Sequence, residues 1–178
     1  MSAPDHEPVF AQLEAANAAY VADGAHRELP VRPARRLSVV TCMDARIDVY
    51  AALGLDLGDV HVIRTAGARV TDDVLRSLAL STHVLGTNQV AVIAHTDCGL
   101  HDPEGRLPDQ LAEKLGPGAR DREWHTFTDP EDAVRSDCER LRVWEDRPAD
   151  LRVAGYVLDI TDGRLHCAVP PLTDANPT

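Results

Sequence analysis

Apolar positions follow two different periods in the middle of this chain, and the two periods alternate. Short, nearly continuous apolar runs at residues 37–42, 60–64 and 89–94 predict buried strands. Apolar residues at helical spacing between these runs predict helices near residues 47–53 and 74–85. Continuous apolar strands that alternate with helices are typical of a parallel sheet covered on both faces. The pattern therefore predicts an α/β fold with a mainly parallel sheet flanked by helices.

Beyond the third apolar run the pattern changes to a loop, a helix and a hairpin. Proline and glycine are frequent at residues 102–130 and predict a loop, interrupted by a turn of helix at 111–115. A helical period then predicts a helix at 131–145. The apolar segments 151–160 and 165–169 are separated by a Thr-Asp-Gly-Arg turn signal. They are therefore predicted to form a hairpin, with the second segment as the return strand.

The segment before the first strand is predicted to be a helical arm. An Ala-rich stretch at residues 9–21 predicts an amphipathic helix that packs either on its own domain or on a partner subunit. The apolar residues at helical spacing are Phe10, Leu13, Ala16 and Tyr20. We therefore expect three regions: an N-terminal helical arm and linker at 1–36, an α/β domain at 37–170, and a tail at 171–178.

Length, charge and cysteine content narrow the class of protein. A chain of 178 residues fits one domain with a sizeable core. The formal net charge of −11 argues against nucleic acid or an anionic membrane as a partner, because both need basic patches. No apolar run has the length of a membrane span, and the polar N-terminus lacks the signature of a secretory signal. We therefore expect a cytoplasmic protein whose cysteines remain thiols.

Soft metal ligands follow two of the predicted strands. Cys42 ends the first apolar run, and His95 and Cys98 follow the third. In a doubly wound sheet these strands are neighbours, and their carboxyl ends lie where open α/β sheets bind ligands. Two thiolates and one imidazole suit zinc and leave a fourth position for water, which is typical of a catalytic site. Cys138 and Cys167 lack such neighbours and are predicted to be core or half-buried structural residues.

Asp44 and Arg46 lie directly beyond Cys42 and are predicted to form an ion pair. A zinc ion with two thiolates and a neutral imidazole is formally neutral, so it needs assistance to acidify its water. An ionised Asp44 can only accept hydrogen bonds, so it is predicted to orient zinc-bound water or hydroxide towards an electrophile. A second interpretation stays open: Asp44 leaves Arg46 and becomes a fourth ligand. The protein would then be a non-catalytic module with a closed zinc site, for example a bicarbonate sensor.

These motifs, with others along the chain, resemble the β-class carbonic anhydrases. The matching segments are residues 42–46, 58–67, 73–85, 95–99 and 155–163. The chain is especially similar to short bacterial members that carry Met-Asp-Ala-Arg and His-Thr-Asp-Cys-Gly. The resemblance implies one zinc ion per subunit on Cys42, His95 and Cys98. It also implies reversible hydration of carbon dioxide to bicarbonate and a proton by a zinc-bound hydroxide.

The same resemblance assigns further roles and an assembly. Asp44 and Arg46 would form the catalytic dyad, and the backbone amide of Gly99 would help to seat the product. His101 is either a proton relay or a solvated loop histidine. The implied sheet has four parallel strands and one antiparallel edge strand. The implied assembly is a homodimer or a higher even oligomer, in which the N-terminal helix embraces the partner.

Two positions depart from the family pattern, and the substrate stays open. Ala45 stands where many members have serine, and Thr65 stands where many have asparagine. Relatives of this short type include hydrolases of carbonyl sulfide and carbon disulfide, which are isoelectronic with carbon dioxide. The same zinc site could attack any of these molecules, so hydrolysis of carbonyl sulfide or carbon disulfide is the alternative enzymatic hypothesis.

Overall fold

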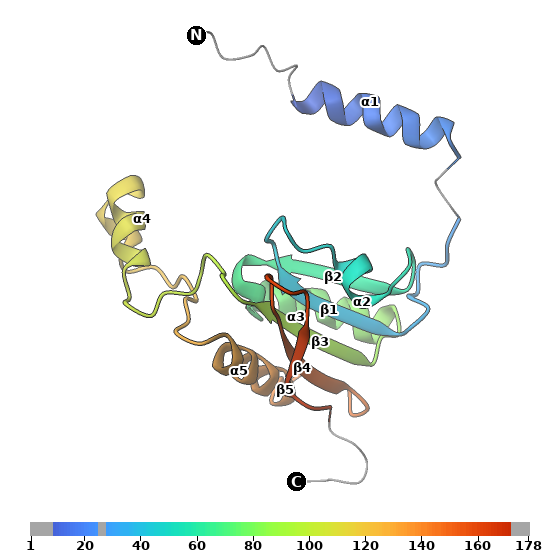
Figure 1. The fold of residues 1–178 in the computed structure, drawn as a ribbon. Helices are drawn as coiled ribbons and strands as arrows, with labels where there is room; N and C mark the ends of the chain where they lie inside the picture. The colour runs from blue at the N-terminus through green and yellow to red at the C-terminus, as the bar shows by residue number, and fades with distance from the viewer. Residues whose placement is uncertain (1–8, 25–27, 172–178) are drawn as a thin grey trace, which may run out of the picture. The chain divides into compact units, whose positions relative to one another are not determined.

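The structure is a computed structural model that describes residues 9–24 and 28–171. The chain divides into two compact units, residues 1–30 and residues 31–178 (Figure 1). The boundary between the units lies inside the region 1–36 that was expected to form the helical arm and linker. Apart from its first residue, the predicted C-terminal tail lies outside the described residues.

The smaller unit contains one described helix, α1, at Val9–Ala22. This confirms the predicted helix but not its amphipathic character. Gln12 lies on the opposite side of the helix from Glu14 and Asn17, because successive residues are rotated by about 100°. Apolar side chains therefore surround most of α1, and Phe10 is among those exposed in the described chain.

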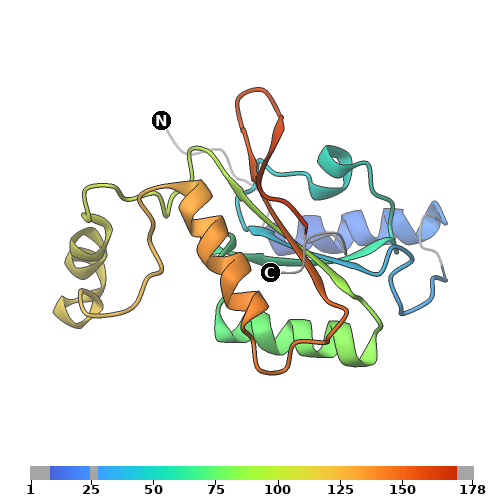
Figure 2. The same cartoon turned by 90° about the horizontal axis from the view of Figure 1, so that it is seen from below.

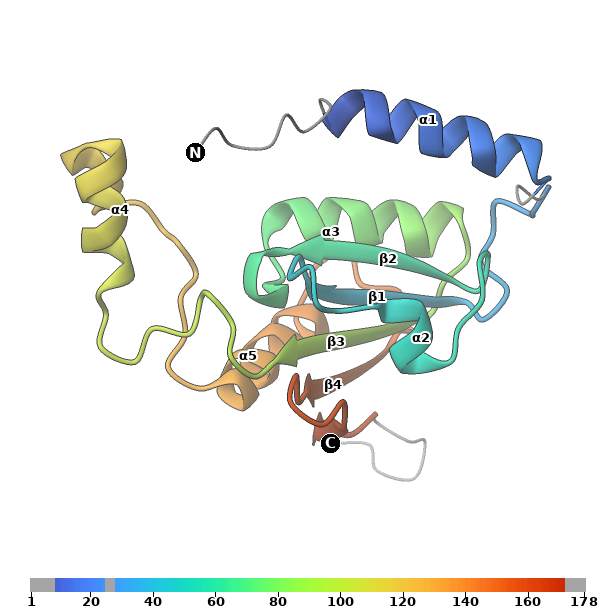
Figure 3. The same ribbon diagram turned by 45° about the horizontal axis from the view of Figure 1, so that its top comes forward.

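The larger unit is built on one five-stranded sheet. Its strands are β1 Leu37–Cys42, β2 Val60–Thr65, β3 Gln89–His95, β4 Arg152–Leu158 and β5 Leu165–Val169. The strand order is β2-β1-β3-β4-β5 (Figure 3). Neighbours among β1 to β4 are parallel, whereas β5 pairs antiparallel with β4. The predicted sheet is therefore confirmed. Strand β1 lies beside β3, so the residues that follow the two strands can form one site.

Helices connect the strands of this unit. They are α2 Val49–Leu53, α3 Asp72–Ala79, α4 Leu107–Leu115 and α5 Pro130–Arg142. A π-helical turn at Leu80–Val84 continues α3, so the helix predicted at 74–85 is present but begins earlier and ends in a wider turn. α2 begins at Val49, because the side chain of Asp48 accepts a hydrogen bond from the Ala51 amide and caps the helix.

Helix α4 is the largest difference from the sequence prediction. One helical turn was expected at 111–115 within a loop, whereas α4 begins at Leu107. The reason is Asp102, whose carboxylate accepts hydrogen bonds from the backbone amides of Arg106 and Leu107 and so caps the helix from a distance. Helix α5 is shorter than predicted. It ends at Arg142, whereas the sequence predicted a helix that continues to residue 145.

The two faces of the sheet are covered unequally. Helices α3 and α5 pack on one face, where Val74 and Val134 join a core cluster with the strand residues Val40 and Val92 (Figure 2). The opposite face carries the short helix α2 and a groove of about 480 Å³, whose lining is partly polar through Arg35, Gln89 and Arg152. The groove lining includes Leu37, Val39, Leu53, Ala91, Tyr156 and Leu165. The sheet is thus flanked by helices. Within the described part of this unit the second face is covered in part, because Val39 and Ile93 are buried there in a second core cluster while the groove stays accessible.

The two cysteines outside the ligand clusters differ in burial. Cys138 on α5 is fully buried, as predicted. Cys167 is exposed, so its predicted core or half-buried position was wrong. The reason is its place on β5, the edge strand, whose first residues are all exposed. Among the residues that the structure describes, no helix is long and apolar enough to cross a membrane.

Candidate active site

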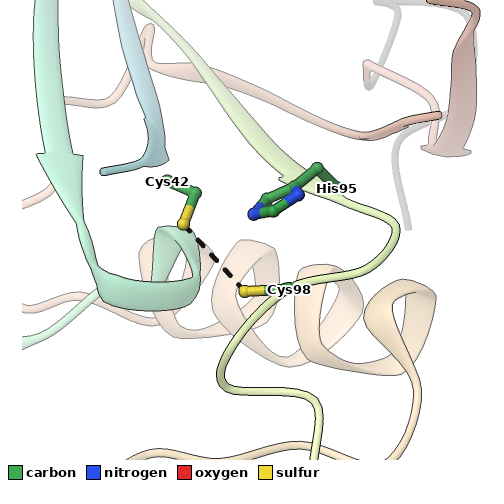
Figure 4. A group of neighbouring side chains, drawn as sticks. All are labelled: Cys42, His95 and Cys98. Carbon is green, nitrogen blue, oxygen red and sulfur yellow. Dashed lines mark hydrogen bonds between the residues drawn. The ribbon is translucent and has the colours of Figure 1, made fainter. Parts of the chain in front are cut away.

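Three predicted metal ligands converge at the carboxyl ends of β1 and β3. Cys42 is the last residue of β1, His95 is the last residue of β3, and Cys98 lies in the loop that follows (Figure 4). Their ligand atoms lie within 4.8 Å of one another, and the two sulfur atoms are 4.0 Å apart. All three residues are buried. The parallel pairing of β1 with β3 therefore brings together residues that are far apart in the sequence.

The imidazole of His95 is held so that one nitrogen faces the two sulfur atoms (Figure 4). Its Nδ1 lies 2.8 Å from the Thr96 carbonyl oxygen, which can only accept a hydrogen bond, so Nδ1 carries the proton. Nε2 then presents a lone pair. It is buried and has no hydrogen-bond partner within the described part of the chain. A backbone carbonyl that fixes the tautomer of a metal-binding histidine is a common arrangement around zinc.

In the absence of a metal, the proximity of the two thiols moves their pKa values in opposite directions. The contact with the Cys98 thiol is the largest cause that lowers the pKa of Cys42 to about 3, and the His95 imidazole and the amides of Asp44 and Gly67 lower it further against the effect of burial. The same contact raises the pKa of Cys98. A divalent cation that binds both sulfur atoms would displace the proton of the Cys98 thiol.

The donor set fits zinc. Two sulfur atoms and an imidazole nitrogen are the ligands that zinc prefers, and three protein ligands leave one position for water or substrate. The buried, unpartnered Nε2 of His95 gives a second reason, because such polar atoms in native proteins normally have a partner. Cys42, His95 and Cys98 could therefore hold one zinc ion.

A glycine supports the sulfur of Cys42 from the loop after β2. Gly67 has a φ of 65°, and a Cβ at this position would lie 3.0 Å from Leu100. Both the left-handed backbone and the close approach require glycine. Thr65, at the end of β2, donates a hydrogen bond of 3.1 Å to the carbonyl of Arg69 and so closes this loop. Thr65 thus supports the loop from the position where many family members carry asparagine.

Asp44 and Arg46 form the predicted ion pair beside the ligand group. Arg46 donates from Nε to Oδ1 of Asp44 at 3.0 Å and from Nη2 to Oδ2 at 2.7 Å. The Arg46 backbone amide also donates to Oδ1, at 2.9 Å. These hydrogen bonds hold the pKa of Asp44 well below its usual range, so the carboxylate stays ionised. Oδ2 of Asp44 lies 3.9 Å from Nε2 of His95, at the edge of the ligand group.

Two residues at the site were missed by the sequence interpretation. Arg64 on β2 donates to the carbonyl oxygens of Cys42 and Asp44, at 2.9 and 2.6 Å. Asp97 accepts two hydrogen bonds from Arg46, on its carboxylate at 2.7 Å and on its carbonyl at 2.9 Å. Both residues belong to motifs that carry the family resemblance. Their roles were hidden because they depend on strand register and on a left-handed backbone at Asp97.

The two remaining predicted site residues lie in the loop after Cys98. Gly99 is exposed, and a Cβ there would meet open space. His101 is exposed, donates a hydrogen bond of 3.0 Å from Nε2 to the Thr128 carbonyl, and stacks on Phe127. The product-seating role of Gly99 and the proton-relay role of His101 stay predictions.

Comparisons with known proteins agree on one family. A family model described as carbonic anhydrase matches residues 37–114. The β-carbonic anhydrase 1 of Mycobacterium tuberculosis is 36% identical over 160 residues, which cover 87% of this chain and 95% of the relative. A carbon disulfide hydrolase from an Acidianus species is 33% identical over 155 residues, covering 74% of this chain and 76% of the relative.

A solved structure resembles the whole fold. The crystal structure of a carbonic anhydrase from Streptococcus mutans superposes with a TM-score of 0.85 at 40% identity, covering 92% of this chain and 99% of that chain. A carbonic anhydrase from Glaciozyma antarctica superposes with a TM-score of 0.77 at 34% identity, covering 95% of this chain and 100% of that chain. The likeness therefore extends well beyond the ligand motifs. This chain belongs to the carbonic anhydrase family, as a member of its β class.

Proposed function

We propose that this protein catalyses the reversible hydration of carbon dioxide to bicarbonate and a proton, with one zinc ion held by Cys42, His95 and Cys98. The observation that carries the proposal is the convergence of these three ligand atoms within 4.8 Å, with Nε2 of His95 buried and unpartnered among the described residues. When bound, zinc supplies a Lewis acid that allows a water molecule to ionise near neutral pH.

Asp44 has one acceptor position left for the attacking water. Oδ1 accepts two hydrogen bonds, from the backbone amide and Nε of Arg46, whereas Oδ2 accepts one from Nη2. A carboxylate oxygen offers about two lone pairs, so Oδ2 keeps one. Oδ2 is also the oxygen close to Nε2 of His95. The ionised Asp44 therefore accepts a hydrogen from the water and turns the oxygen lone pair towards the carbon atom of carbon dioxide.

Arg46 holds Asp44 in this orientation and away from the metal ligands. Arg46 donates to both oxygen atoms of the Asp44 carboxylate, and this bidentate contact fixes the plane of the carboxylate. This geometry favours an open fourth position over the closed alternative, in which Asp44 would leave Arg46 and bind the metal. The proton released by the reaction must reach solvent, and we propose the exposed His101, three residues after Cys98, as its relay.

Hydrolysis of carbonyl sulfide or carbon disulfide is the second candidate function. It is supported by the relatives named carbon disulfide hydrolase, one of which is 33% identical over 155 residues. The same attack by an oriented water would serve these isoelectronic substrates. The shape of the substrate pocket would then decide between the substrates.

A paired assay on one zinc-loaded preparation separates the two activities. Carbon dioxide hydration is followed by stopped-flow pH change, and hydrolysis of carbonyl sulfide and carbon disulfide by release of hydrogen sulfide. The proposal predicts rapid hydration and slow release of sulfide. The opposite order would make this protein a hydrolase, and inactivity on all three substrates would favour the closed, sensing module. Asp109→Asn is a matched control, because Asp109 forms an exposed ion pair with Arg120 on α4 and the adjoining turn.

We also propose that the protein forms a homodimer or a higher even oligomer. Two surfaces with exposed apolar side chains support this proposal: α1 and the groove beside α2, which Leu37 and Leu165 help to line. Each would leave water when subunits associate. A cytoplasmic location stays a prediction.

A further inference from the structure

We propose that Asp97 is a positioning residue, which holds Arg46 in the orientation that presents Asp44 to the reacting water. This inference rests on the proposed function, because it concerns how the Asp44 carboxylate is held. Neither the sequence pattern nor the comparisons assign a role to Asp97, whose neighbours His95 and Cys98 carry the metal-binding hypothesis.

The guanidinium of Arg46 is held from two sides. Its Nε and Nη2 donate to the carboxylate of Asp44. Its Nη1 donates to Oδ2 of Asp97 at 2.7 Å, and Nη2 also donates to the Asp97 carbonyl at 2.9 Å. Asp97 therefore binds the edge of the guanidinium that Asp44 leaves free.

The backbone of Asp97 is adapted to this contact. Asp97 has a φ of 54°, in the left-handed region that non-glycine residues rarely adopt and that aspartate tolerates better than most. In this conformation the carbonyl and the carboxylate of one residue both reach Arg46. Local strain of this kind persists where surrounding contacts hold it, and it is frequent at functional sites.

Arg46 needs this second partner because it is not buried. Its side chain is 47% exposed, so solvent competes for its hydrogen bonds and its long chain keeps rotational freedom. If Asp97 were absent, Arg46 could move into solvent and Asp44 would lose the partner that directs it. Because the side chain of Asp97 is itself 80% exposed, its ion pair contributes little to the stability of the fold. Loss of the Asp97 side chain should therefore make the Arg46 side chain more mobile and lower kcat/KM, while the stability of the fold hardly changes.

Two substitutions separate the carboxylate from the backbone conformation. Asp97→Gly removes the carboxylate, and glycine adopts the positive φ without strain. Asp97→Asn keeps an acceptor oxygen and also tolerates the left-handed region. The order of Arg46 is measured in zinc-loaded protein by the heteronuclear NOE of its Nε–H group, which is assigned as the resonance lost in Arg46→Lys. Zinc content, melting temperature and kcat/KM are measured on the same samples, with Asp109→Asn as the control.

We expect Arg46 to be rigid in the wild type and in Asp97→Asn, and mobile in Asp97→Gly. In Asp97→Gly, kcat/KM should fall about fivefold, the scale of one exposed ion pair, and Asp97→Asn should restore most of it. The melting temperature and the zinc content should match the wild type. A rigid Arg46 in Asp97→Gly, a mobile one with unchanged kcat/KM, or loss of zinc would each overturn the inference. The NOE needs no turnover, so an inactive wild type would refute the proposed function while the role of Asp97 is still decided.

Discussion

At the scale of single residues, the state of the four thiols follows from their surroundings. The sulfur atoms of Cys42 and Cys98 lie 4.0 Å apart. Burial raises the pKa of the Cys138 thiol to about 12, so this thiol is unreactive at neutral pH. Cys167 is exposed on the edge strand. Bound zinc should therefore protect Cys42 and Cys98 from thiol reagents and leave Cys167 accessible to them.

We predict that a thiol-labelling reagent modifies one cysteine, Cys167, in the native zinc-loaded protein. After zinc is removed, mild oxidation should join Cys42 to Cys98, because a thiolate and a thiol already lie side by side. Intact-mass spectrometry with peptide mapping reports both results. Cys167→Ser serves as the control and should abolish labelling of the zinc-loaded protein. Equal labelling of Cys42 with and without zinc would contradict the ligand assignment.

The charge on Asp44 gives a second prediction at this scale. Asp44→Asn keeps the shape of the side chain but replaces one acceptor oxygen with a donor, which faces either Arg46 or the water. We expect carbon dioxide hydration to slow on the order of 100-fold, as when an oriented hydrogen bond to the transition state is lost. Stopped-flow rates on samples of equal zinc content measure this effect. A rate within a factor of two of the wild type, on the scale of measurement error, would show that Asp44 has no part in the reaction.

The same variant tests the protonation state of Asp44 through stability. Hydrogen bonds from Arg46 place the pKa of Asp44 in the folded protein below the ordinary value of 3.8. A lowered pKa stabilises the fold above the ordinary value, and this stabilisation is lost as the pH falls through the folded-state pKa. The difference in unfolding free energy between wild type and Asp44→Asn should thus be constant above about pH 5 and shrink only below about pH 4. A difference that changes near neutral pH would contradict this assignment.

At the scale of secondary-structure elements, the contact of α5 with β4 leaves no room at one glycine. A Cβ on Gly155 of β4 would lie 2.3 Å from Cγ1 of Val134 and 2.8 Å from the sulfur of Cys138, both on α5. β4 pairs with β3, the strand that ends at His95. The close approach of α5 to the sheet therefore supports the strand that carries a ligand.

We predict that Gly155→Ala lowers the unfolding free energy by about 2–3 kcal/mol, because the added methyl group overpacks the contact. Urea denaturation measures the change. The matched control is Gly118→Ala, since a Cβ at Gly118 meets nothing within 4 Å. The control should be close to the wild type. A neutral Gly155→Ala would mean that α5 packs on the sheet less closely than in this structure.

The strands were predictable from the sequence, but some helix boundaries and side-chain partners were not. Buried parallel strands leave continuous apolar runs, so β1 was predicted at its observed bounds. The first residues of helix α4, before the predicted turn at 111–115, were missed because Asp102 caps the helix from outside it, beyond the reach of local capping rules. The ligand set was predictable from strand ends and topology. Asp97 was not, because its contact with Arg46 depends on a positive φ that aspartate adopts only in some contexts.

At the scale of the whole molecule, two compact units carry different surfaces. The unit of residues 31–178 contains all the candidate site residues, whereas the unit of residues 1–30 contains α1 with its exposed apolar side chains. Within the described chain no residue of α1 is buried. A single helix of this length gains little stability by itself, so tertiary or subunit contacts must stabilise it. This is consistent with a role of the helical arm in assembly.

We predict that removing residues 1–30 weakens association. Light scattering coupled to size-exclusion chromatography should give at least a dimer for the full chain and a monomer for the shortened one. Retention of the same assembly by the shortened chain would show that α1 is not needed. Zinc content is measured on both samples, because the ligands all lie in the larger unit and should still bind the metal.

The most direct test of the central claim is carbon dioxide hydration by the full, zinc-loaded protein. Stopped-flow measurement compares the wild type with Cys42→Ser, which removes one of the three ligands, and with wild type stripped of zinc. We predict a rate well above that of buffer for the zinc-loaded wild type, and a rate equal to buffer for the two samples without an intact zinc site. A wild-type rate no higher than buffer, or no higher than that of Cys42→Ser, would contradict the proposed function.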